Sequence, residues 1–178
     1  MKGEHRPKLF GTNGVRGIFG KDLSLEFLIK VSRSLGSFFE KGPLLVGFDG
    51  RISSPVISKI VSAVLNSSGK DTSIAGLLPT PCLQYATKHF GYPGGIMITA
   101  SHNPPEYNGI KAIANDGVEI SRDEESKIEL NYNSGEIQPV SKIAQESNDD
   151  RVIPSYVDSA IQVVKSEKIY SKGFKIVM

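Results

Sequence analysis

Cysteine and long apolar runs are almost missing from this sequence of 178 residues. The one cysteine, Cys82, excludes an internal disulfide and cannot by itself form a thiolate metal site. No apolar run approaches the roughly 20 residues that cross a bilayer. The opening residues, MKGEHRPKLF, lack the apolar core of a signal peptide. With 39% hydrophobic and 22% charged residues, the sequence predicts a cytoplasmic enzyme or binding domain with no membrane partner.

The net charge of +2 shows no strong excess of either sign, but the charge is unevenly distributed. Residues 1–114 carry a net +6, residues 115–150 a net −7 and the remainder a net +3. The basic part contains Arg16, Arg51 and Lys111, which suits an anionic small molecule. Because there is no clustered basic stripe and no series of stacking aromatics, we do not expect a nucleic acid partner.

Strand and helix patterns alternate along the first three quarters of the sequence, which predicts a three-layer α/β/α domain. The fourth expected strand follows the third after about ten residues, too few for a helical crossover, so it should pair antiparallel. We therefore expect a mixed, mostly parallel sheet. Ser24, Thr80 and Ser121 are the expected helix N-caps. The expected strands are 44–48, 72–78, 94–99 and 109–114, and the expected helices are 24–40, 55–69, 80–89 and 121–132.

The remaining sequence predicts a break between two domains. Residues 134–151 lack apolar periodicity and are rich in turn formers, so they predict a linker or domain edge between a first domain, 1–133, and a second, 152–178. The second begins with a helix around 156–164. FKIVM (174–178) predicts a strand that has only just begun, so we expect this domain to be truncated. An exposed strand would favour dimerisation or edge pairing.

The stretch TASHNPPEYNGIKA, residues 99–112, places a serine, a histidine and a lysine around a stiff bend. Ser101 follows the end of an expected strand, where ligands of open α/β sheets bind. The two prolines fix the backbone and would hold the serine hydroxyl in place. Lys111 would return to the same site, where it could offset phosphate charge or move a proton. From the residues alone, a surface hairpin with a capping serine and a solvated lysine stays an open alternative.

Among the chemistries that such a bend could support, a hydrolase triad fits poorly. The sequence has no G-x-S-x-G elbow, and adjacent Ser101 and His102 should point apart in extended chain. Phosphoryl transfer fits better, because it needs mainly positioning and positive charge.

Two further stretches carry glycine beside a charged side chain. In FGTNGVRG, residues 10–17, the glycines allow close backbone approach, and Arg16 offers a planar fork that suits phosphate oxygens. A hairpin with an exposed arginine is the alternative. In GFDGR, residues 47–51, we favour a structural role in which Asp49 orders the turn.

These stretches together resemble the α-D-phosphohexomutase family, which includes phosphoglucomutase, phosphomannomutase and phosphoglucosamine mutase. TASHNPPEYNGIK is similar to the family's phosphoserine loop, and FGTNGVRG to its N-terminal loop. GFDGR followed by SSP, and then LLPTP, match its intervening landmarks in the same order. The resemblance covers residues 9–120.

The resemblance implies that Ser101 is phosphorylated. Ser101 would give its phosphoryl group to a hexose phosphate and take it back from the other end of a bisphosphorylated sugar. An oxygen of the same phosphate would ligate Mg²⁺, which makes Ser101 a metal-site residue as well. The implied cofactors are therefore Mg²⁺ and a hexose 1,6-bisphosphate.

Other positions acquire roles by the same resemblance. Lys111 is similar to the family's proposed general acid/base. Arg16 and His102 match positions that contact the phosphate or assist proton movement. Asn103 and Thr12 would support the loop and the phosphate.

The resemblance also defines what is not present. Family members have four domains, and this sequence covers the first and the opening of the second. The remaining Mg²⁺ ligands and the sugar-recognition loop would belong to the missing domains of the same enzyme, so this chain alone should not turn over substrate. Glucose, mannose and glucosamine all stay open as the sugar. A stand-alone sugar-phosphate-binding or regulatory module without catalysis is the alternative function.

Overall fold

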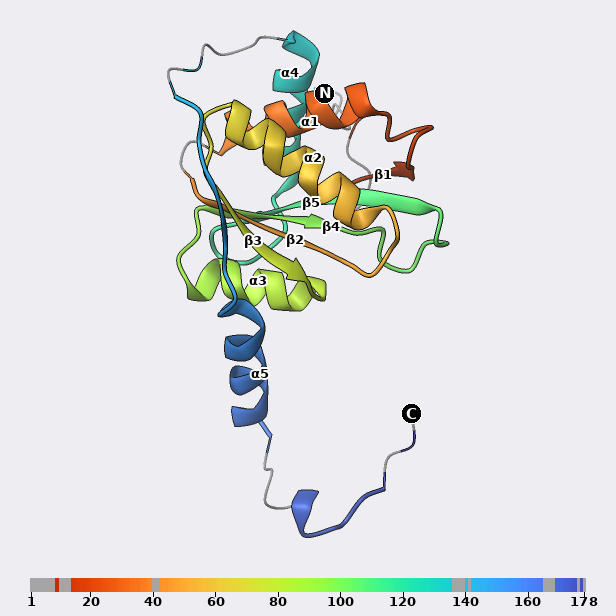
Figure 1. Ribbon diagram of the computed structural model, residues 1–178, viewed down its shortest axis with the longest axis vertical. Coiled ribbons are helices and arrows are strands. Elements are labelled where there is room, and N and C mark those ends of the chain that lie inside the picture. Colours follow the sequence, from red (N-terminus) through yellow and green to blue (C-terminus); the bar gives the residue numbers. More distant parts are fainter. Residues whose placement is uncertain are drawn as a thin grey trace, which may run out of the picture.

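The computed structural model describes residues 9, 14–39, 42–135, 140, 142–164, 169–175 and 177. Six strands form one sheet in the order β1-β5-β4-β2-β3-β6. Helices α1, α2 and α4 cover one face of this sheet and α3 covers the other, which confirms the three-layer arrangement (Figure 1). The elements are β1 (Val15–Ile18), α1 (Leu25–Phe38), β2 (Leu44–Phe48), α2 (Ser54–Ser67), β3 (Thr72–Leu77), α3 (Thr80–His89), β4 (Gly94–Ile98), β5 (Tyr107–Ala114), α4 (Arg122–Ser134), β6 (Glu146–Asn148) and α5 (Val152–Gln162).

The sheet is mixed, as expected. Strand β2 pairs in parallel with both β3 and β4, and β6 pairs in parallel with β3. Strand β5 pairs antiparallel with β4, which confirms the argument from the short connection. Strand β1 pairs antiparallel with β5 at the sheet edge. Every residue of β4 is buried, because helices cover both sides of this central strand.

The helix starts test the expected caps. The Ser24 hydroxyl accepts a hydrogen bond from the backbone N–H of Phe27 at 3.2 Å, and Ser121 forms a full capping box with Glu124. The prediction that Thr80 caps its helix was wrong. Thr80 is the first residue of α3, and Pro79 occupies the cap position without a side-chain hydrogen bond. Two prolines at this start carry no backbone N–H, which leaves fewer donors for a capping hydroxyl to satisfy.

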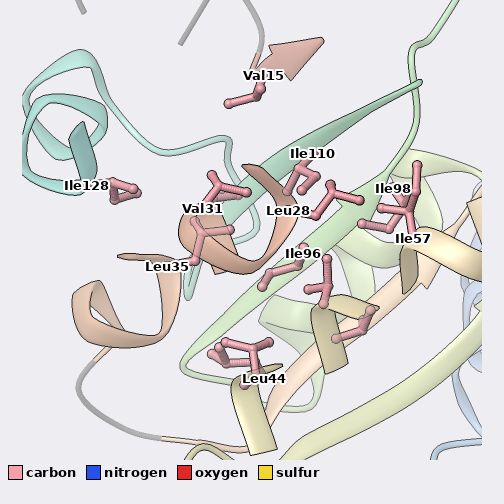
Figure 2. Close-up of a cluster of buried hydrophobic side chains, with 14 of the residues drawn as sticks. Val15, Leu28, Val31, Leu35, Leu44, Ile57, Ile96, Ile98, Ile110 and Ile128 are labelled. Atoms are coloured by element: carbon pink, nitrogen blue, oxygen red, sulfur yellow. The ribbon is translucent and has the colours of Figure 1, made fainter. Parts of the chain in front are cut away.

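Two apolar cores hold the layers together. The larger core lies between the sheet and α1, α2 and α4, and it includes Leu28, Ile57, Ile96, Ile110 and Ile128 (Figure 2). Burying a side chain of this size stabilises the fold by roughly 1.5–3 kcal/mol. The smaller core lies between the sheet and α3 and includes Leu45, Cys82, Leu83, Met97 and Ile113. The sheet is therefore a rigid platform whose strand ends can hold a site.

The C-terminal part differs from its prediction in its elements. Residues 146–148, expected within a linker, form the edge strand β6, and Asp149 behind them is buried. Helix α5 begins at Val152, four residues before the expected start at 156, and packs against α3. Phe174, Lys175 and Val177 form no strand, and the other two residues of 174–178 lie outside the described residues. The domain boundaries stay a prediction.

None of the helices that the structure describes combines the length and the apolar character needed to pass through a membrane.

Candidate functional site

Ser101 lies in the loop that leaves the central strand β4 and returns along β5. Its backbone has a positive φ of 57°, and no other described residue except glycine adopts such an angle. Its N–H donates to the hydroxyl of Thr99 at 2.9 Å, and its side chain is exposed. Non-glycine residues are held in this strained region mainly where the surroundings fix them, and such positions concentrate at functional sites. The backbone of Ser101 is therefore held in place, and its side chain is presented to solvent.

The same strained turn brings His102 closer than expected. The hydroxyl Oγ of Ser101 lies 3.4 Å from Nδ1 of His102, at the long end of hydrogen-bonding distance. The expectation that the two side chains point apart assumed extended chain and was wrong, because Ser101 is in the left-handed region. The His102 ring therefore lies within reach of the serine oxygen.

The side chain of Arg51 holds the serine loop by donating hydrogen bonds to the loop's backbone carbonyls. Its Nη1 donates to the carbonyls of Pro104 and Tyr107 at 2.6 and 3.0 Å. Its Nη2 donates to the carbonyls of Ser101 and Asn103 at 2.9 and 2.7 Å. Four carbonyls of the loop therefore converge on one guanidinium, which holds the loop's shape together with its two prolines.

Asp49 completes this support. Its carboxylate accepts hydrogen bonds from Arg51 Nε at 3.1 Å, from the Ser54 hydroxyl at 2.6 Å and from the Thr99 hydroxyl at 2.7 Å. Burial raises the pKa of Asp49, but these hydroxyls, the Arg51 backbone N–H and the guanidinium charge outweigh burial and lower the pKa overall. The expected role of Asp49 in ordering its turn is confirmed, and it extends to the serine loop.

Arg16 reaches the same loop from the neighbouring strand β1. Its Nη1 donates to the side-chain oxygen of Asn103 at 3.2 Å. Its Nε is buried and has no hydrogen-bond partner within the described part of the chain. Arg16 pairs with Gly109, where an added Cβ would lie 3.0 Å from Arg16 Cγ and 2.4 Å from the carbonyl oxygen of Val15. Glycine at this position therefore lets the arginine stem cross β5.

Lys111 lies on the same face of the sheet as Arg16. Paired residues of adjacent strands share a face, Arg16 pairs with Gly109, and Lys111 is two residues further along β5. Such diagonal neighbours have Cα atoms about 7–8 Å apart. Lys111 is buried, and its ammonium donates to Glu119 Oε1 at 2.7 Å. Two cationic residues therefore lie on one side of the sheet. The Arg16 guanidinium contacts the serine loop, and the Lys111 ammonium contacts Glu119.

The expected site residues thus fall into three groups. Ser101 contacts His102, and Arg16 contacts Asn103 of the same loop. Lys111 shares their side of the sheet, but its ammonium contacts Glu119. Thr12 lies outside the described residues.

Sequence reasoning missed two contributors. The sequence assigned Arg51 no contact of its own beyond its charge and its place in GFDGR, although its position shortly after a buried parallel strand was a usable signal. Glu119 carried no signal, because it is eight residues from Lys111 across a turn and is one of many acidic residues in 115–150. Their contacts arise only when the chain folds.

The described residues contain no group of three or more histidine, cysteine, aspartate or glutamate side chains that could hold a metal. The carboxylate that supports the serine loop, Asp49, is already used by Arg51, Ser54 and Thr99. The part of the chain that the structure describes therefore does not form a complete Mg²⁺ site.

Comparison with known proteins supports the family resemblance that the sequence motifs indicate. Residues 7–138 match the family model described as phosphoglucomutase/phosphomannomutase, alpha/beta/alpha domain I. A phosphoglucosamine/phosphogalactosamine mutase of Sulfurisphaera tokodaii is 44% identical over 175 residues, which cover 96% of this chain and 38% of that protein. A phosphoglucosamine mutase of Prochlorococcus marinus strain MIT 9215 is 38% identical over 176 residues, with the same coverage of both proteins.

Solved structures show the same fold. A crystal structure from Thermus thermophilus, described as a phosphomannomutase, superposes with a TM-score of 0.71 and 29% identity over 81% of this chain and 33% of that one. A Paramecium phosphoglucomutase, pp63/parafusin, shares the fold with a TM-score of 0.70 at 16% identity. The chain spans little more than a third of the length of the relatives it matches.

Proposed function

Because the chain belongs to the phosphoglucomutase/phosphomannomutase family and contains its α/β/α domain I, we propose that it supplies the catalytic serine of a phosphohexomutase. The observation that carries the proposal is the serine loop. Ser101 is exposed on a strained turn that Arg51 holds by four hydrogen bonds, and Arg16 binds the same loop. A fixed hydroxyl beside fixed positive charge is what phosphoryl transfer requires.

In the proposed reaction, Ser101 carries the phosphoryl group on Oγ. A hydroxyl oxygen of a hexose phosphate attacks the phosphorus, the bond from phosphorus to Ser101 Oγ breaks, and a bisphosphorylated sugar forms. The proton of the sugar hydroxyl passes to a base, and a proton returns to the Ser101 oxygen. The sugar then gives back the phosphoryl group from its other end by the reverse step. The net result moves a phosphate between C1 and C6.

The residues around Ser101 suit separate parts of this cycle. Arg16 has an unpartnered buried Nε within the described chain and would stabilise negative charge on the transferring group. His102 lies 3.4 Å from Ser101 Oγ and could return the proton to it. Lys111 is the proposed acid/base for the sugar hydroxyl. Asn103 would keep Arg16 in position, and Thr12 is the remaining proposed support.

The cofactors and partners belong to the same proposal. Mg²⁺ would neutralise phosphate charge, with the phosphate on Ser101 as one ligand and the others supplied from outside the described residues. A hexose 1,6-bisphosphate would act as activator and intermediate. The names of the two curated relatives favour a hexosamine phosphate as the first substrate to assay. We further propose a cytoplasmic enzyme in which residues 152–178 begin a second domain.

The test uses a fusion in which this chain replaces the matched part of the Sulfurisphaera tokodaii relative, so that the following domains are present. With glucose 1,6-bisphosphate and Mg²⁺, mass spectrometry should find phosphate on Ser101. Ser101→Ala should remove that phosphate and lower mutase turnover by a factor of at least about 10³.

Ser67→Ala is the matched control, because Ser67 is an exposed serine at the end of α2 whose hydroxyl, among the described residues, bonds its own helix. It should leave phosphorylation and turnover unchanged. Turnover that survives Ser101→Ala would disprove the proposal. A fusion that binds the bisphosphate but never becomes phosphorylated would favour the binding module instead.

A further inference from the structure

Lys111, the proposed acid/base, forms an ion pair with Glu119, a residue to which the proposed transfer gives no role. Lys111 Nζ donates to Glu119 Oε1 at 2.7 Å. The lysine side chain is 10% exposed, whereas the glutamate side chain is 34% exposed. The lysine is therefore enclosed by protein, and its carboxylate partner lies at the boundary with solvent, where it has room to move.

The backbone turn that carries Glu119 does not need this ion pair. The N–H of Ala114 donates to the Val118 carbonyl at 2.8 Å, and the N–H of Ile120 donates to the Ala112 carbonyl at 3.1 Å. The Asp116 side chain accepts from the Val118 N–H at 2.9 Å. These bonds close the turn on both sides of Glu119. The carboxylate on Lys111 is thus not explained by local folding.

The burial of Lys111 supplies an explanation. Its side chain is only 10% exposed, and a charge in such a place is costly unless an opposite charge pairs with it. The Glu119 carboxylate offsets that cost while no ligand is bound. A ligand phosphate beside Lys111 would offset it as well, so the phosphate and Glu119 would compete for the Lys111 ammonium.

We propose that Glu119 is a positioning residue that occupies the Lys111 ammonium in the empty site and yields it to the phosphate of the sugar ligand. The proposal rests on the proposed function, since it takes the region beside Ser101 as the place where that phosphate binds. It predicts that a substitution which removes a contact raises the affinity for the ligand. Removing the Glu119 charge should strengthen ligand binding, whereas loss of a merely structural contact would weaken it.

The experiment titrates the 178-residue chain with glucose 1,6-bisphosphate and follows the amide signals of residues 99–109 by NMR. Glu119→Gln should lower the dissociation constant three- to tenfold, which corresponds to about 0.7–1.4 kcal/mol. Lys111→Gln should raise it. In the Lys111→Gln background, adding Glu119→Gln should not lower the dissociation constant, because Glu119 then has no ammonium to occupy. Glu119→Asp should bind more nearly like the unchanged chain.

Asp123→Asn is the matched control for net charge, because Asp123 is an exposed acid near the start of α4. If Glu119→Gln tightens binding no more than Asp123→Asn does, or weakens it, the inference is wrong while the proposed function stands. If Lys111→Gln binds as the unchanged chain does, or if no binding occurs, the anion region beside Ser101 is itself wrong. The proposed function then loses its main support together with the inference.

Discussion

The chain contains the same short turn twice, and its two copies have different tasks. Asp49 and Arg51 follow strand β2 and lead into α2, and Asp149 and Arg151 follow β6 and lead into α5. In both turns the arginine N–H donates to the aspartate Oδ1 at 3.1 Å, and the arginine Nε donates to the same carboxylate. Locally, the two turns are nearly equivalent.

The difference lies in where the guanidinium groups go. The Arg51 side chain is 11% exposed, and both of its Nη atoms bind carbonyls of the serine loop. The Arg151 side chain is 69% exposed. Its Nη2 returns to Asp149 at 2.8 Å, and its guanidinium carbon lies 4.7 Å from the centre of the Phe90 ring. One arginine organises a distant loop, and the other fastens its own turn. The comparison shows that the residues around each turn, rather than the shared aspartate and arginine, determine what the arginine binds.

The largest effect is expected from a substitution that disrupts the first turn. Arg51→Leu removes every bond from the guanidinium to the serine loop, so Ser101 should lose its fixed direction. Misplacement of a reacting group by about 1 Å costs roughly 100-fold in rate, and we expect a loss of that size in phosphoryl transfer by the fusion enzyme. Turnover is measured at saturating substrate, together with hydrogen exchange of residues 99–109, which should become faster.

Arg151→Leu is the matched change in the second turn. It should reduce thermal stability and leave the rate of transfer unchanged, because Arg151 bonds no residue of the serine loop in the described chain. Equal losses of activity from the two substitutions would erase the distinction between the turns.

A smaller effect is expected on stability and its pH dependence. Hydrogen bonds from Arg151, with further help from Tyr92 and against the opposing effect of burial, lower the pKa of Asp149 to about 2. An aspartate with a lowered folded-state pKa stabilises the fold above its unfolded pKa of about 3.9, and that stability is lost as the pH falls through the folded value. Asp149→Asn should therefore cost about 2 kcal/mol at pH 7 and nearly nothing at pH 2.

Denaturant unfolding from pH 7 down to pH 2 measures this difference. Asp150→Asn is the control, because Asp150 is the exposed neighbour of the buried Asp149. A constant gap between Asp149→Asn and the unchanged chain across this range would show that the Asp149 charge is not the source of the stability.

The smallest effect is expected at Tyr92, the buried partner of Asp149 in the second turn. The Tyr92 hydroxyl donates to Asp149 Oδ2 at 2.7 Å and lies 3.0 Å from the Ser73 hydroxyl. Tyr92→Phe removes these bonds with little change in shape, so we expect a loss of about 1 kcal/mol in unfolding free energy. Thermal unfolding measures the loss. In the fusion enzyme, transfer should stay at its original rate, and a fall in transfer would place this second turn in the site after all.

Much of the fold followed from the sequence because its signals are local. The apolar runs of β2 and β4 and the helical spacing of α1 and α2 identify their own conformations, and the short β4–β5 connection is long enough only for an antiparallel return. Strands β1 and β6 were not predicted, because each is short, lies at a sheet edge and acquires its structure by pairing. Ser101, Arg16 and their loop were found because glycine, proline and charge cluster there.

The sequence by itself determined the layers, the mixed sheet and the stiff loop with a serine at a strand end, since propensity, periodicity and chain length act over a few residues. Tertiary structure alone decided that Arg51 turns inward to the serine loop, that Arg151 turns back to Asp149, and that Glu119 reaches Lys111. Each of these contacts depends on which strands become neighbours. A long charged side chain has many equally good local conformations, and only the packed sheet selects one of them.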